Sequence, residues 1–252
     1  ELGISIGKVT EDGKFGLFET SCIGLSDQET SALINFHPFT ELDPEKVRSL
    51  IARLRKGESP TALADTPKDN VHYVPQGDKT IFFKDYQPGS GLRKALDKDP
   101  EEVIELVKRS KLSGRGGAFF PTGLKWSICR SQDSDEKYLI CNADEGEPGT
   151  FKDRVLMNRL PGLLIEGMAI AAYAIGARKG FIYLRAEYYY MKKKIENAIR
   201  EFKENHLLGQ DILDRRGFDF DVSVYLGAGA YVCGEETALI ASMEGKRGES
   251  ST

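Results

Sequence analysis

The chain has 252 residues, of which 40% are hydrophobic and 29% are charged, a composition typical of a folded globular protein. Its 35 Lys and Arg residues stand against 39 Asp and Glu residues, so the formal net charge is −4, and the two signs are interspersed. The sequence has no excess or stripe of basic residues of the kind that binds nucleic acid, so we expect no nucleic-acid partner. The longest apolar run, residues 163–175, contains Glu166 and is shorter than the roughly 18 residues of a membrane helix, so no membrane span is expected.

Cysteine use points to a reducing compartment. The four cysteines form no CxxC pair, which favours free thiols in the cytoplasm over a disulfide framework. The three histidines have no spacing typical of a metal site or a catalytic triad, so we expect no metal site in this chain. These residues are Cys22, Cys129, Cys141, Cys233, His37, His72 and His206. The chain begins at Glu1 without a Met and stops abruptly at Thr252, and we expect it to be a fragment.

Residues 1–58 form the first predicted unit. Residues 31–36 are predicted to be a buried strand that ends at His37. Asp43 is the predicted N-cap of a helix that Pro44 opens. One strand pair and one helix are too few to close a core, so we expect the C-terminal part of a small α/β domain.

A linker at residues 59–80, rich in Pro, Asp, Thr and Gly, is predicted to join this unit to a second domain at residues 81–252. In that domain strands alternate with helices, which predicts an α/β fold with a mostly parallel sheet. The expected strands are 138–141, 181–185 and 218–224, and the expected helices are 99–107, 161–175, 191–209 and 234–244.

The segment 113–126 is a candidate ligand-binding loop, called the glycine loop below. Its glycines leave room for a ligand to approach the backbone, whose amides can cradle a phosphate or lie against a planar ring. Cationic and aromatic side chains accompany them. The alternative interpretation is a surface turn without a ligand. The candidate residues are Gly114, Arg115, Gly116, Gly117, Phe120 and Lys125.

The segment 141–153, called the acidic loop below, follows a predicted strand directly. Ligands bind at the carboxyl ends of strands in open α/β sheets. Its carboxylates and amide offer acceptors for ribose, a polyol chain or a carboxamide. The alternative is that the charges cap the next helix. The candidate residues are Asn142, Asp144, Glu145 and Glu147.

The segment 227–237, called the third loop below, is again a glycine-rich turn between a strand and a helix. The start of that helix offers an anion site, although the segment is neither a Walker loop nor a GxGxxG fingerprint. A purely structural explanation also holds, since carboxylates suit a first helical turn. The candidate residues are Tyr231, Gly234, Glu235 and Glu236.

Together, SGRGGAFFPTGLKW, YLICNADEGEPGTFKDR, LLIEGMAIAAYAIGA, FIYLRAEY and GAGAYVCGEETALIASMEGKRG resemble the flavin- and NADH-binding subunits of respiratory complex I and its soluble relatives. Upstream, FGLFETSCIGLSDQE, SALINF and the DPEKV helix resemble a thioredoxin-like module. This fusion is most similar to diaphorase subunits of bidirectional NAD-reducing hydrogenases. The resemblance implies a Rossmann-like FMN- and NADH-binding domain behind the C-terminal part of a thioredoxin-like domain.

The resemblance also implies the cofactors FMN and NAD(H), with hydride passing from nicotinamide C4 to flavin N5. FMN would lie between the glycine loop and the acidic loop, and NADH would stack on its exposed face. Family flavin contacts fall on Gly114, Arg115, Gly116, Gly117, Lys125, Asn142, Asp144, Glu145, Tyr231, Gly234, Glu235 and Glu236. Family nucleotide contacts fall on Phe120, Lys125, Glu147, Tyr231 and Glu236.

The partners implied by the resemblance are an iron–sulfur electron-transfer subunit and nickel–iron hydrogenase subunits in a hetero-oligomer, with electrons exchanged between H2 and NAD+. Alternatives are the equivalent subunit of an NAD-dependent formate dehydrogenase or of complex I. A different class of alternative is an interaction module without a cofactor.

The sequence departs from the family pattern at two positions. Phe119 stands where the glycine loop usually has its last glycine, and Ser26 stands where cluster-binding relatives of the module have Cys, so only Cys22 of that pair remains. We therefore expect no [2Fe-2S] cluster in the module. The resemblance implies a [4Fe-4S] cluster only in a region beyond Thr252.

Overall fold

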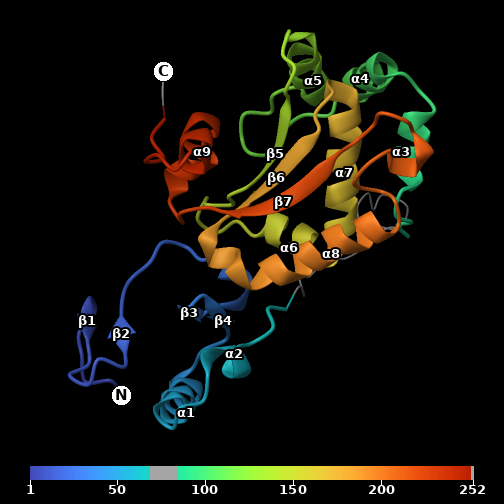
Figure 1. Cartoon of the computed structure of the whole chain (residues 1–252). Helices are drawn as coiled ribbons and strands as arrows, with labels where there is room; N and C mark the ends of the chain where they lie inside the picture. Colours follow the sequence, from blue (N-terminus) through green and yellow to red (C-terminus); the bar gives the residue numbers. More distant parts are fainter. Residues whose placement is uncertain (69–84, 251–252) are drawn as a thin grey trace.

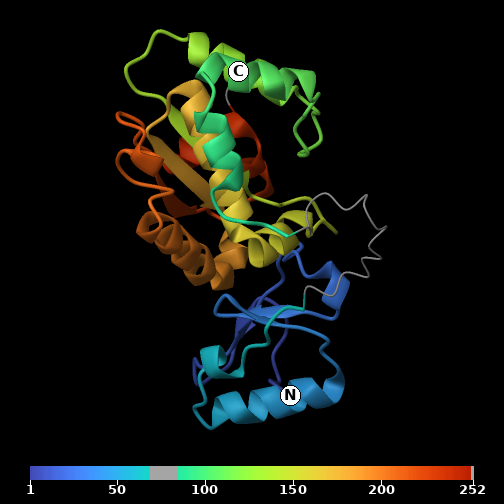
Figure 2. The ribbon, with the colours of Figure 1, turned by 90° about the vertical axis from the view of Figure 1, so that its right-hand side faces the viewer.

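The computed structural model describes residues 1–68 and 85–250. It places a small N-terminal module, residues 1–68, below a larger α/β domain in Figure 1, and Figure 2 shows the same arrangement after a 90° turn. The module consists of β1 (Lys8–Val9), β2 (Gly16–Leu17), η1 (Ser26–Gln28), β3 (Ala32–Ile34), β4 (His37–Phe39), α1 (Pro44–Arg55) and α2 (Pro60–Leu63). Its strands form two separate antiparallel pairs, β1 with β2 and β3 with β4.

The prediction of one buried strand over residues 31–36 is wrong. β3 ends at Ile34 and turns back into β4, in which Ile34 pairs with His37. Asn35 and Phe36 form the turn with φ of 50° and 63°, a left-handed geometry that suits a two-residue hairpin. Phe36 is therefore 53% exposed instead of buried.

The helix prediction for the module is confirmed. α1 begins with Pro44 in its first turn, and the Asp43 carboxylate accepts a hydrogen bond from the Lys46 amide at 2.7 Å. This is the N-cap arrangement that satisfies one of the free amides of the first turn. No residue of α1 is fully buried, so its apolar side is only partly covered by the described residues.

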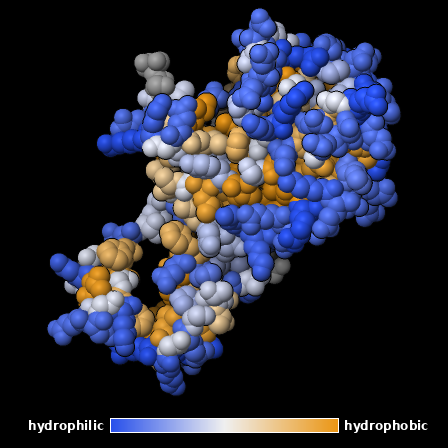
Figure 3. Space-filling model, in the orientation of Figure 1, coloured by the Kyte–Doolittle hydropathy of each residue, from blue (hydrophilic) through white to orange (hydrophobic). Residues whose placement is uncertain are grey.

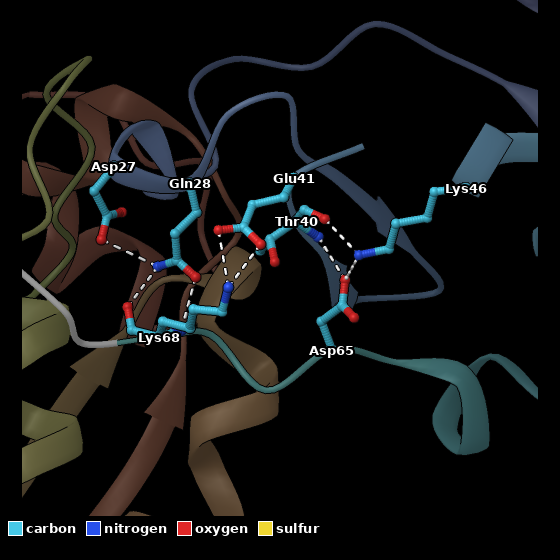
Figure 4. A network of polar contacts seen from close by, with 7 residues as sticks. All are labelled: Asp27, Gln28, Thr40, Glu41, Lys46, Asp65 and Lys68. Carbon is cyan, nitrogen blue, oxygen red and sulfur yellow. Dashed lines mark hydrogen bonds and ion pairs between the residues drawn. The ribbon is translucent and has the colours of Figure 1, made fainter. Parts of the chain in front are cut away.

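Polar contacts tie residues 65–68 to the rest of the module (Figure 4). The buried Gln28 side chain pairs with the backbone of Lys68: its oxygen accepts from the Lys68 amide at 2.7 Å and its nitrogen donates to the Lys68 carbonyl at 2.7 Å. Asp65 accepts hydrogen bonds from the Thr40 amide and the Lys46 ammonium group. The predicted linker 59–80 thus starts with ordered structure, α2 and this attached segment, while its residues 69–80 lie outside the described part.

The α/β domain has a parallel sheet in the order β5 (Tyr138–Ala143), β6 (Lys179–Leu184), β7 (Asp221–Leu226). Cys141 lies beside Ile182 and Ile182 beside Val224, so corresponding residues share one face. The predicted mostly parallel α/β fold is confirmed. The described helices of this domain are α3 (Ser90–Leu96), α4 (Pro100–Arg109), α5 (Thr122–Ser131), α6 (Lys152–Arg159), α7 (Pro161–Ile175), α8 (Lys192–Glu204) and α9 (Glu236–Met243). Short 3-10 helices are η3 (Ala186–Met191), η4 (Ile212–Asp214) and η5 (Tyr231–Gly234).

Two apolar clusters lie on the two faces of the sheet. On one face α7 packs against the strands, with Ile165, Ile182 and Leu184 fully buried in the main cluster. On the other face Tyr183 packs with Leu239 of α9 and Cys233. Figure 3 shows apolar side chains along β7 above the polar surface of α8, where this strand forms an edge of the described sheet. Among the described residues, no single helix is both long and apolar enough to cross a membrane.

Glu166, the charged residue inside the apolar run 163–175, has a structural role. Glu166 is buried in α7, and its carboxylate accepts hydrogen bonds from the amides of Gly89, Gly91 and Leu92 and from the Tyr86 hydroxyl, at 2.6–3.0 Å. It thereby satisfies free amides at the start of α3. Burial and the hydrogen bond to Glu166 raise the pKa of Tyr86, so this phenol remains a donor.

Replacing Glu166 by Gln is expected to lower the free energy of unfolding by about 2–4 kcal/mol, because an amide nitrogen would face buried N–H donors. Urea unfolding of the purified protein measures the loss. Glu105→Gln is the matched control, since Glu105 is an exposed helical glutamate whose Lys108 contact is 3.9 Å long. Equal unfolding free energies for the two variants would contradict the capping role.

Candidate functional site

The three candidate loops meet at the carboxyl end of the sheet. The Asn142 side chain donates a hydrogen bond to the Gly234 carbonyl at 2.8 Å, joining the acidic loop to the third loop. The Tyr231 hydroxyl donates to the Glu147 carboxylate at 2.7 Å. From the glycine loop, the Lys125 ammonium group lies 3.1 Å from the Glu236 carboxylate. Segments far apart along the chain therefore form one site, in which parallel strands deliver two of the three loops to the same edge.

The glycine loop is closed at its base and open along its tip. Ser113 and Pro121 form a β-bridge, and the Gly114 amide donates to the Phe120 carbonyl at 2.9 Å. A Cβ at Gly116 or Gly117 would meet no atom within 4 Å, and Gly117 has a φ of 112° that favours glycine. The tip therefore has space at its backbone, as a ligand cradle requires.

Cationic and aromatic groups border this space. The Lys125 ammonium group lies 5.7 Å from the centre of the Phe120 ring, a cation–π distance. Phe120 is 43% exposed, and Arg115 is also exposed. A flat apolar ring, the exposed Arg115 and Lys125, which is paired with Glu236, thus border a space that suits a ligand with an aromatic base and phosphates.

Phe119 has a backbone conformation that suits glycine. Its φ is 51°, in the left-handed region that side chains with a Cβ rarely adopt. The backbone keeps the conformation suited to glycine, and the aromatic ring stands 61% exposed on the loop. Phe119 therefore adds apolar surface beside Phe120.

Asp144 is the most unusual acid of the site. Its Oδ2 atom is buried and has no hydrogen-bond partner among the described residues. Burial raises the pKa of this carboxyl group to about 6, helped by the negative charge of Glu187 and opposed by Arg185. The atom lies close to Gly146 and Gly234, where a Cβ would come within 3.9 Å and 3.7 Å of it.

Two of the candidate acids cap helices. The buried Glu145 carboxylate accepts hydrogen bonds from the amides of Asp153 and Arg154, at 2.9 and 3.1 Å, and from the Tyr188 hydroxyl at 2.9 Å. Glu235 accepts from the amides of Thr237 and Ala238 at the start of α9. The structural alternative weighed from the sequence therefore describes what these two side chains do, and a ligand role for either stays a prediction.

Buried charged residues that the sequence reasoning missed lie directly behind the site. Arg185 and Glu187 are 3% and 6% exposed and form an ion pair at 3.1 Å. Arg154 is also buried and pairs with Asp27 of the N-terminal module at 2.7 Å. Two charges directly after an apolar strand, in the sequence LRAE, were the available signal, because buried charges need partners.

No group of three or more His, Cys, Asp or Glu side chains within residues 1–68 and 85–250 could hold a metal ion. The Cys22 sulfur lies 3.4 Å from the Ser26 hydroxyl. His37 contacts the Thr61 hydroxyl at 2.9 Å, whereas His72 lies outside the described residues.

Comparison with known proteins agrees with this geometry. Residues 107–252 match the family of the Nuo51 FMN-binding domain, and residues 1–55 match the thioredoxin-like [2Fe-2S] ferredoxin family. The NAD-reducing hydrogenase HoxS subunit alpha of Cupriavidus necator is 50% identical over 98% of this chain and 43% of that protein. A NADH-quinone oxidoreductase component of Rhizobium meliloti is 53% identical over 70% of this chain and 42% of that protein.

Among solved structures, a NAD+-reducing [NiFe]-hydrogenase in the H2-reduced state matches with a TM-score of 0.87 and 38% identity. The match covers 99% of this chain and 42% of that one, so the chain spans less than half the length of these relatives. All three loops of the site fall within residues 107–252. By this match and by its parallel sheet, the chain belongs to the Nuo51 FMN-binding domain family.

Proposed function

We propose that this chain forms the FMN- and NADH-binding part of the diaphorase subunit of an NAD-reducing hydrogenase. The observation that carries the proposal is the joining of the glycine, acidic and third loops by the contacts of Asn142, Tyr231 and Lys125. This arrangement gives one site with open backbone, aromatic rings and a buried carboxylate oxygen that has no hydrogen-bond partner among the described residues.

The residues present fit FMN. A planar ring needs backbone that can be approached closely, and Gly116 and Gly117 supply it. A flavin edge carries both donors and acceptors, and the unpartnered Oδ2 of Asp144 is a buried polar atom in need of a partner. We assign to FMN contacts Gly114, Arg115, Gly116, Gly117, Lys125, Asn142, Asp144, Glu145, Tyr231, Gly234, Glu235 and Glu236, and to nucleotide contacts Phe120, Lys125, Glu147, Tyr231 and Glu236.

FMN, when bound, takes the two electrons of a hydride and releases them singly. The chain's own residues bind and orient, and none has to act as a general acid or base. The Phe120 ring offers a face on which the adenine of NADH can stack. The Lys125 ammonium group offers a positive charge to a phosphate. Glu147 and Glu236 place negative charge near the anionic dinucleotide, and this repulsion weakens its binding and speeds its release.

The N-terminal module favours a hydrogenase over complex I as the parent complex. The match to the hydrogenase protein covers 98% of this chain, whereas the match to the quinone oxidoreductase protein covers 70%. We propose a cytoplasmic hetero-oligomer with an iron–sulfur subunit and nickel–iron hydrogenase subunits. A formate dehydrogenase or complex I remains the second candidate, and an interaction module without a cofactor the third.

Purification of the whole protein with its copurifying subunits tests the proposal. We expect flavin absorbance, NADH-driven dye reduction and a nickel–iron partner. A molybdenum partner would support the formate dehydrogenase instead. A colourless protein without NADH oxidation would leave only the interaction module.

Glu147→Ala is expected to lower the KM for NADH by about three- to tenfold while flavin content stays intact, because it removes a negative charge that we propose to repel the anionic dinucleotide. Steady-state kinetics and flavin extraction measure the two effects. Glu136→Ala is the matched control, since the Glu136 carboxylate also accepts from a tyrosine hydroxyl, that of Tyr138, at 2.6 Å. Parallel loss of flavin in Glu147→Ala would assign the residue to the wrong ligand.

Gly116→Val is expected to remove FMN, because the branched side chain would occupy space that the protein itself leaves open. Flavin fluorescence after denaturation measures occupancy. Gly167→Val in α7 serves as the control, since a Cβ there also meets no atom within 4 Å. Full occupancy in Gly116→Val would refute the cradle.

Asp144→Asn is expected to stabilise the folded protein at pH 7.5 by on the order of 1 kcal/mol, and by less at pH 4.5. The pKa of Asp144 is raised to about 6 by burial, so the stability that its proton contributes is complete below pH 3.8 and is lost as pH rises through 6. Urea unfolding at the two pH values measures the difference. The exposed Asp133→Asn is the control, and a pH-independent effect of Asp144→Asn would contradict the raised pKa.

A further inference from the structure

The N-terminal module touches the α/β domain directly behind the site, through its segment 22–28. The Arg185 guanidinium donates a hydrogen bond to the Cys22 carbonyl at 2.6 Å and another to the Glu145 carbonyl. It also pairs with Glu187, so its charge is compensated where it is buried. Arg185 is thus a rigid bridge between the module and the acidic loop.

A second contact runs through Tyr188. Gly24 has a φ of 73°, and a Cβ built on it would overlap with the Tyr188 hydroxyl group. The fully buried Tyr188 ring is therefore held against the module backbone. Its hydroxyl donates to the Glu145 carboxylate at 2.9 Å.

A third contact runs through Arg154. Its guanidinium pairs with Asp27 at 2.7 Å, and its backbone amide donates to the Glu145 carboxylate at 3.1 Å. Asp27 also accepts from Gln28, which belongs to the network of Figure 4.

The Cys22 side chain itself contacts the module, because its sulfur lies 3.4 Å from the Ser26 hydroxyl.

All three contacts end on Glu145, which is the residue between Asp144 and Gly146. We infer that segment 22–28 of the N-terminal module is a positioning element of the nucleotide site, which acts by fixing Glu145 and, through it, the backbone of the acidic loop. The inference extends the proposed function, on which its kinetic test rests. It gives the module a role that requires no cluster and no ligand of its own.

Hydrogen exchange in the whole protein tests the inference without relying on activity. In Gly24→Ala, amide exchange across residues 142–153 is expected to rise several-fold, because the added Cβ displaces Tyr188. Gly13→Ala is the matched control: Gly13 lies in the same module with a φ of 69°, and its Cβ would meet no atom within 4 Å. Equal exchange in the two variants would overturn the inference.

Tyr188→Phe is the milder variant, since it removes only the hydroxyl that reaches Glu145. Tyr173→Phe is its control, because the Tyr173 hydroxyl also donates a hydrogen bond, to the Lys98 carbonyl at 2.7 Å. Faster exchange at the amides of Asp153 and Arg154 in Tyr188→Phe alone is expected. Unchanged exchange there would refute the route through Glu145.

Kinetics of the same variants separate positioning from general destabilisation. Tyr188→Phe is expected to raise the KM for NADH about three- to tenfold, the equivalent of one hydrogen bond, with kcat within about twofold of the parent. A parallel fall of kcat and protein stability, matched by Tyr173→Phe, would show a merely structural role. A parent protein that does not oxidise NADH would refute the proposed function but leave the exchange experiment decisive for the inference.

Discussion

The hydrogen bonds accepted by the buried carboxylate of Glu145 are the interaction on which the candidate site depends. A charged group that is buried away from water must be compensated by hydrogen bonds. Here the amides of Asp153 and Arg154 in α6 and the Tyr188 hydroxyl donate them. These bonds fix the start of α6 relative to the end of β5, so the loop between them has little freedom. The acidic residues at its tip are therefore presented in a set geometry.

The sheet explains why that geometry produces a site. Parallel strands end at one edge, and the loops after β5 and β7 meet there because β6 lies between them in register. The glycine loop reaches the same edge from the side of α5. Lys125 at the beginning of that helix joins it to the third loop through Glu236.

Several buried charged side chains lie next to this edge of the sheet. Arg185 pairs with Glu187, Arg154 pairs with Asp27, and Asp144 keeps one oxygen without a partner among the described residues. Paired charges of this kind fix relative positions more than they add stability. In this protein both buried arginines also contact the N-terminal module, so the position of the module and the shape of the acidic loop are physically linked.

The sequence by itself determined the class of the fold, the strands and helices with strong periodicity, and the three loops that the structure joins into a candidate site. Local signals carried these predictions: Asp43 and Pro44 at the start of α1, Pro161 at the start of α7, and the glycines of the loops. The resemblance to the family was found from the sequences of the motifs. The short α3, α5 and α6 were missed, since their periodicity is too brief to be distinguished from the loops beside them.

The tertiary structure alone decided which acid keeps a buried oxygen without a partner among the described residues and which acids cap a helix. Asp144 and Glu145 are adjacent in sequence and alike in chemistry, yet one has a buried oxygen without a partner among the described residues and the other accepts three hydrogen bonds. The difference comes from the partners of Glu145. Tyr188 lies far away along the chain, and α6 follows a turn that no local sequence pattern specifies. Contacts between distant segments set the environment of a side chain, and that environment determines its chemistry.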